Sequence, residues 1–283
     1  MLVPRANDAQ RRCCGAILIA ISMLGCQSAK KMLAPSQHRD WQPLYSVLPT
    51  VDFQGEQVTI RNVRYCKHLD KESYVPDWYD KSIDLRDIRA VDFVVMPFPD
   101  TPALAHTQVS FEIARPGSPP EYLSVSAEVR KEKGETYGPV KGSARQFELT
   151  YVVADERDVI ESQTIHYDRD VYLYRSTATP EKAQRLFVDI MGRVNQLATR
   201  PEFYDTLTNN CTTNIVEHIN RIQPQRVTYD YRVLLPGMSD ELAYDQGLIE
   251  RHGSFDQTKA RAYLNPRARQ FAGREDFSQL IRR

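Results

Sequence analysis

The sequence lacks an excess of charge, a long apolar run and the motifs of common nucleotide and zinc enzymes. Its 37 Lys and Arg residues are balanced by 37 Asp and Glu residues, without a basic run in the mature part, which argues against a nucleic-acid partner. The one uncharged apolar stretch is shorter than the about 20 residues that cross a bilayer as a helix, which excludes a polytopic membrane protein. P-loop, GxGxxG and HExxH motifs are absent, and we expect neither a cofactor nor a metal.

What the sequence does contain is enough apolar material for a full core. Apolar residues make up 41% of the 283 residues and aromatic residues 10%, which excludes disorder as the general state. The 12 glycines and 17 prolines are ordinary amounts and exclude collagen-like or low-complexity chains.

The N-terminus has the pattern of a secretory signal peptide over residues 1–25. A region with three arginines precedes the apolar stretch of residues 13–25, and a small residue precedes Cys26. The sequence Met-Leu-Gly-Cys at this junction resembles a lipobox, which predicts that Cys26 becomes the lipidated N-terminus. An uncleaved anchor and plain secretion are the alternatives. Gln27 replaces the aspartate that commonly retains lipoproteins at the inner membrane of Gram-negative bacteria, so we expect a lipid anchor at the periplasmic face of the outer rather than the inner membrane.

The remaining chain divides into a polar linker, residues 26–40, and one domain, residues 41–283. Alternating β-rich runs predict strands in the first part of this domain; they lie at residues 57–66, 91–98, 106–114, 122–130, 147–154 and 170–176. Apolar spacing then predicts a helix from Pro180 to about residue 198, capped by Thr179, and a second helix from Cys211, capped by Asn210 or Thr208. Strands followed by helices indicate an α+β domain, with an antiparallel sheet packed against the helix that carries Cys211.

Cys211 is the candidate nucleophile because a helix start stabilises a thiolate. The N–H groups there, with the Asn210 amide, are suited to hold the oxyanion of a tetrahedral intermediate. Two other interpretations stay open. Cys211 is also consistent with a small buried residue of structural role, and in an oxidising compartment it can form a disulfide with Cys66.

His106 is the candidate base, because it opens a strand after a Pro-containing segment, where a side chain can point into a cleft. His218 lies two helical turns from Cys211, about 10 Å along the axis and too far for a direct hydrogen bond. A hairpin turning near Gly117 places Glu128 opposite His106, where it would orient the imidazole.

A register slip of one residue would bring Ser126 or Glu112 beside the histidine instead of Glu128. Asn62, Arg64 and Arg130 are further polar groups at strand ends, which either line the cleft or form surface ion pairs.

Several separated motifs together resemble the Lnb N-terminal periplasmic domain family over about residues 41–283. They are NVRYC (62–66), VPDWYDKSIDL (75–85), AHTQVSFE (105–112), LSVSAEVRKEKGE (123–135), YVVADERDVI (151–160), PEFYDTLTNNCTTNI (201–215) and LLPGMSD (234–240). The resemblance implies a circularly permuted papain-like, NlpC-like domain, with the histidine strand before the cysteine helix. It also implies Cys211 as nucleophile, His106 as base and Glu128 as orienting group.

By this resemblance the function is thiol acyl transfer. Cys211 would take an acyl chain from a membrane phospholipid as a thioester and pass it to an amine, the N-terminus of an apolipoprotein. The family name implies membrane helices further on, and this sequence has none after residue 26, a departure that concerns the acyl acceptor rather than the thioester chemistry. The alternatives are an NlpC-like thiol hydrolase of cell-wall peptides and a non-catalytic lipoprotein binding module.

Overall fold

The structure is a computed structural model that describes residues 34–71 and 73–283. The predicted signal peptide, Cys26 and most of the predicted linker lie outside the described residues. No helix within the described ranges has the length and apolarity needed to cross a membrane.

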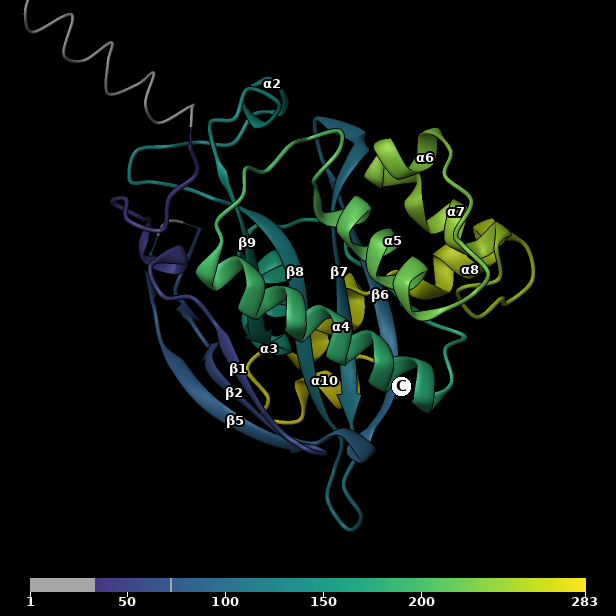
Figure 1. The fold of residues 1–283 in the computed structure, drawn as a ribbon. Coiled ribbons are helices and arrows are strands. Elements are labelled where there is room, and N and C mark those ends of the chain that lie inside the picture. The colour runs from purple at the N-terminus through teal and green to yellow at the C-terminus, as the bar shows by residue number, and fades with distance from the viewer. Residues whose placement is uncertain (1–33, 72) are drawn as a thin grey trace, which may run out of the picture.

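One large, mostly antiparallel sheet forms the centre of the domain (Figure 1), with the strand order β1-β2-β9-β8-β7-β6-β10 and with β5 paired to β2. The strands are β1 (Thr50–Gln54), β2 (Gln57–Arg64), β5 (Trp78–Asp84), β6 (Ile88–Phe98), β7 (Thr101–Ile113), β8 (Glu121–Arg130), β9 (Glu148–Asp155) and β10 (Tyr172–Arg175). Strands β3 (Lys67–His68) and β4 (Tyr74–Val75) form a separate small pair. The parallel contact between β2 and β9 is a single pair, Arg64 with Ala154.

Helices cover both faces of the sheet. Figure 1 shows α4 (Pro180–Thr199) and α5 (Cys211–Ile222) across one face, and α3 (Glu156–Glu161) and α10 (Phe277–Leu280) behind the other. The remaining helices are α2 (Pro139–Gly142), α6 (Tyr231–Leu234), α7 (Ser239–Asp245), α8 (Phe255–Ala262) and α9 (Asn265–Phe271), with short turns η1 (Pro43–Tyr45), η2 (Leu85–Asp87), η3 (Ser162–His166) and η4 (Pro236–Met238). The predicted α+β class is therefore confirmed.

The apolar face of α4 packs against the sheet and forms the main core. Phe187 of α4 meets Phe111 of β7 edge to face with ring centres 5.2 Å apart, and both side chains are fully buried. Such a pair adds about 1 kcal/mol beyond its buried area. The predicted cap is also present, because the Thr179 hydroxyl accepts the Lys182 N–H.

All six predicted strands coincide with strands of the sheet, whereas β1 and β5 escaped the sequence analysis. β5 is an edge strand in which only Ile83 is buried, so its sequence carries almost no apolar alternation. Its partner β2 is irregular between Ile60 and Val63, where Asn62 has a φ of 61°. Asparagine tolerates this left-handed conformation better than most residues.

Strands β7 and β8 separate at one end, and this separation positions the site described below. Their pairing extends from Ile113–Glu121 only to Val109–Val125. Beyond that point β7 stays paired to β6 and β8 stays paired to β9. The first residues of α5 reach β7 there, since the hydroxyl groups of Thr107 and Thr212 are 3.0 Å apart.

The turn η4 packs on the start of β7 and needs a glycine. A Cβ on Gly237 would lie 1.9 Å from the Pro102 carbonyl oxygen, so we expect Gly237→Ala to destabilise the protein by about 1–3 kcal/mol through overpacking. Gly192→Ala is the matched control, because a Cβ at this helical position meets nothing within 4 Å and gains helix propensity. Denaturant unfolding of both variants tests this; equal midpoints would contradict the account.

Candidate active site

Cys211 is the first residue of α5, and Asn210 caps this helix as predicted. The Asn210 side chain accepts the Thr213 N–H at 2.9 Å, and the Thr213 hydroxyl accepts the Asn210 N–H at 2.8 Å. By helix geometry, the N–H groups of Cys211 and Thr212 have no acceptor within the helix. The Asn210 amide nitrogen donates one of its two N–H groups to the Thr206 carbonyl at 2.7 Å, and Asn210 lines the same cleft as Cys211.

The Cys211 thiol is buried beside His106 and the end of β7. The thiol donates to the Ala105 carbonyl at 3.8 Å and lies 4.0 Å from the Thr212 hydroxyl. Burial alone would raise the thiol pKa, but the interactions with His106 and Thr107 outweigh it, and the pKa of Cys211 falls below its usual value. The environment therefore favours the thiolate.

Glu128 stands on the other side of the imidazole. Its carboxylate Oε1 is 3.6 Å from Nε2 of His106, a charge contact longer than a hydrogen bond. The Ser126 hydroxyl at 2.7 Å and the Tyr45 hydroxyl at 3.1 Å donate to the Glu128 carboxylate and fix it. Burial opposes the imidazolium, yet the interaction with Cys211 and the charge of Glu128 raise the pKa of His106.

The register of the hairpin is the one predicted from a turn near Gly117. The observed pairs from Ile113–Glu121 to Val109–Val125 lead, when continued, to His106 opposite Glu128. Ser126 and Glu112 were the candidates to lie beside His106 if the register shifted by one residue. In the structure both have other partners: the Ser126 hydroxyl donates to Glu128, and Glu112 accepts from Arg175 at 2.7 Å.

The three side chains share one cleft with a cavity volume of about 260 Å³. Its lining includes the apolar and aromatic residues Phe98, Leu104, Tyr137, Tyr204 and Pro236. It also includes the basic residues Arg64, Lys131 and Arg169, of which Arg64 is paired with Asp158 and Arg169 lies over the Phe98 ring. The cleft therefore offers apolar and cationic groups to the same ligand.

Arg64 lines the cleft, which is one of the two positions that the sequence left open for it. Asn62 and Arg130 are not among the residues that line the cleft. Asp158 accepts from Arg64 at 2.9 Å and 3.2 Å. Asn62 donates through its side chain to the Leu48 carbonyl at 3.0 Å. Arg130 donates to the Tyr45 carbonyl at 2.9 Å and stacks on the Trp41 ring, so both residues hold other parts of the fold.

No pattern in the sequence predicts that Lys131, Arg169 and Thr107 lie near Cys211. Lys131 follows the strand of Glu128, and Arg169 lies in the segment after η3. Burial lowers the pKa of Lys131, although Glu128 acts in the opposite direction. Only the tertiary fold brings these groups to the cysteine.

Cys66 and Cys211 are both free thiols, so the disulfide that the sequence allowed is not formed. Burial and the nearby Asp158 carboxylate raise the pKa of Cys66 to about 11, opposite to the shift at Cys211. His218 is buried away from the cleft, with Asp189 at 2.6 Å and Tyr151 at 2.5 Å, and ties α5 to α4 and β9. Within residues 34–71 and 73–283, no group of three His, Cys, Asp or Glu residues is arranged to bind a metal ion.

Comparison with known proteins gives one match. A family model described as the Lnb N-terminal periplasmic domain matches residues 74–237, more than half of the chain, and this range contains His106, Glu128 and Cys211. No curated protein and no solved structure matches the chain at a significant level.

We expect the two thiols to differ sharply in alkylation. Because the imidazole lowers the pKa of Cys211, iodoacetamide should modify Cys211 with a midpoint below the usual thiol pKa of about 8.5. His106→Ala should move this midpoint upward, since the imidazole then no longer offsets the effect of burial on the thiol pKa. Mass spectrometry after alkylation at a series of pH values measures both, with Cys66 as the internal reference. An unchanged midpoint in His106→Ala would show that the imidazole does not activate the thiol.

Proposed function

We propose, from the premise that this chain belongs to the Lnb N-terminal periplasmic domain family, that it is a periplasm-facing thiol acyltransferase acting on membrane lipid. The observation that carries the proposal is the grouping of three side chains in the cleft: the Cys211 thiol interacts with His106, and the Glu128 carboxylate lies 3.6 Å from Nε2 of the same imidazole. A nucleophile, a base and an orienting group in this order are the parts that covalent acyl transfer requires.

In the first step the Cys211 thiolate attacks the carbonyl carbon of a lipid ester. The oxyanion that forms is held by the N–H groups of Cys211 and Thr212 at the start of α5. Collapse of this intermediate breaks the ester C–O bond, and the departing glycerol oxygen takes the proton from the His106 imidazolium. The products are a Cys211 thioester and a lysolipid.

In the second step an amine attacks the thioester. His106, now neutral, accepts the proton that the amine nitrogen loses, and the Cys211 thiolate leaves as the amide bond forms. The site then returns to the thiolate and imidazolium with which it began. Glu128 stabilises the imidazolium in both steps without exchanging a proton.

The composition of the cleft favours a phospholipid as the acyl donor. The apolar residues of the cleft, among them Phe98 and Leu104, suit the acyl chain of the ester. The basic residues Lys131 and Arg169 suit the phosphate of the headgroup. For the acceptor we propose the N-terminal amine of an apolipoprotein. A lipid anchor on Cys26 would keep the enzyme at the same membrane as this acceptor. We propose the outer membrane, because Gln27 follows Cys26 in place of the aspartate that retains lipoproteins at the inner membrane.

A permuted papain-like, NlpC-like arrangement agrees with the order of these elements, since β7 with His106 precedes α5 with Cys211. The same thiol and imidazole would also serve an NlpC-like hydrolase of cell-wall peptides. The apolar and aromatic residues in the lining of the cleft favour the lipid ester over a polar peptide substrate.

Thioester formation is the direct test. We expect the full chain, in vesicles of a phospholipid with a tagged acyl chain, to acquire a hydroxylamine-sensitive tag at Cys211. Cys211→Ser should lose the thioester, and His106→Ala should form it about a hundredfold or more slowly.

Cys66→Ala is the matched control and should keep the wild-type rate, because Cys66 is buried behind the Asp158 contact. A thioester that persists in Cys211→Ser would refute the nucleophile. An untagged wild-type protein that instead cleaves stem peptides of the cell wall would assign the hydrolase.

Glu128 should set the alkaline limit of activity. Because its charge raises the pKa of His106, Glu128→Gln should lower that pKa, and the imidazolium should be lost at a lower pH. We expect the alkaline limb of the rate profile to shift toward acid in this variant, with the fold unchanged. If the maximal rate falls but the pH of the alkaline limb stays the same, Glu128 does not act through the pKa of His106 and only maintains the local structure.

A further inference from the structure

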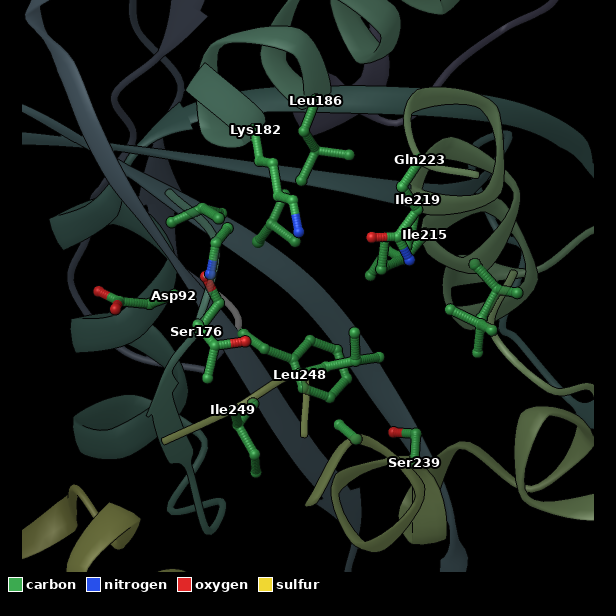
Figure 2. Close-up of a pocket in the computed structure, with 18 of the residues that line it drawn as sticks. Asp92, Ser176, Lys182, Leu186, Ile215, Ile219, Gln223, Ser239, Leu248 and Ile249 are labelled. Carbon is green, nitrogen blue, oxygen red and sulfur yellow. The ribbon is translucent and has the colours of Figure 1, made fainter. Parts of the chain in front are cut away.

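A second, strongly apolar cavity lies on the α4 and α5 side of the sheet, separate from the cysteine cleft (Figure 2). Its volume is about 120 Å³. Its apolar lining residues come from the sheet, from α4, α5 and α7, and from the segments after α5 and α7, and they include Phe93, Leu186, Ile219, Leu242 and Leu248. Such a wall suits an aliphatic group, because contact with it removes apolar surface from water.

The lining of this cavity holds one basic residue, Lys182, and one acidic residue, Asp92. Lys182 extends from α4 toward the space above Leu248, as Figure 2 shows, and its residue is exposed at the rim. Asp92 is the one acidic residue among those lining the cavity. Its carboxylate is bound by Arg175 at 3.0 Å and by Arg282 at 2.8 Å, and so does not neutralise Lys182.

The cavity and the cysteine cleft are separated by the start of α5. Cys211 lines the cleft, whereas Thr212, the next residue, lines the apolar cavity. The hydrogen bond between Thr212 and Thr107 closes the space between the two. A ligand in the apolar cavity can therefore be studied without involving the thiol.

We infer that this cavity is a binding site for a single-chain lipid with a carboxylate headgroup, a free fatty acid. The aliphatic chain lies between Leu186, Ile219 and Leu248, where its burial removes apolar surface from water. The carboxylate pairs with the Lys182 ammonium at the rim. A neutral alcohol of the same length fits the apolar wall but lacks this ion pair, and a cationic amphiphile is repelled.

Photo-crosslinking tests the site in the membrane-bound full chain. The probe is a medium-chain fatty acid with a diazirine near its methyl end, and labelled peptides are mapped by mass spectrometry. We expect saturable labelling on α5 and around Leu248, with unlabelled fatty acid competing better than the alcohol of equal length. Lys182→Gln should weaken the fatty acid about fivefold, as for a partly exposed ion pair, and leave the alcohol unchanged. Lys133→Gln, a remote exposed lysine paired with Asp40, is the control.

Filling the cavity should abolish saturable labelling. Ile219→Trp places a larger side chain in it, and Ile222→Phe is a second variant in case the first does not fold. Val188→Trp adds the same group at an exposed position of α4 and should bind as wild type. Cys211→Ser should also bind as wild type, which separates this site from the acyl-transfer proposal. Labelling that never saturates, that maps to the cysteine cleft, or that is equal in Lys182→Gln would overturn the inference.

Discussion

The electrostatic interaction between Cys211 and His106 is the one on which the account of the site depends. Burial disfavours the charged form of both groups. Together each stabilises the charged form of the other, and Glu128 adds to the imidazolium side. The pair is therefore a product of tertiary structure, since the two residues are far apart in the sequence and come from a strand and a helix.

The separation of β7 from β8 makes room for this pair. If the two strands stayed paired past Val109 and Val125, their ladder would occupy the space that the start of α5 now enters. Instead Thr107 bonds to Thr212 and interacts with the Cys211 thiol, and the capping box at Asn210 fixes the helix that presents the thiol. The same helix start divides the basic and aromatic cleft from the apolar cavity beside α4.

Local chemistry explains what the sequence predicted. Alternation identified the strands, the Thr179 and Asn210 caps identified α4 and α5, and hairpin geometry paired His106 with Glu128. Strand β5 was missed because one buried residue gives no pattern, and Lys131 and Arg169 were missed because their approach to the cleft depends on long-range packing. Asn62 and Arg130 were candidates for the cleft because they are polar residues at strand ends. A polar residue at a strand end does not fix the direction of its side chain, and both side chains bond outside the cleft.

The most direct measurement of the central claim is the titration of the His106 imidazole by nitrogen-15 NMR, in the wild type and in Cys211→Ala. The account predicts a higher pKa of the His106 imidazole in the wild type than in Cys211→Ala, because the sulfur raises the pKa of His106. Without the sulfur, Glu128 alone opposes burial, and the pKa of the ring should fall. Identical titration curves in the two proteins would show that no thiolate–imidazolium pair exists.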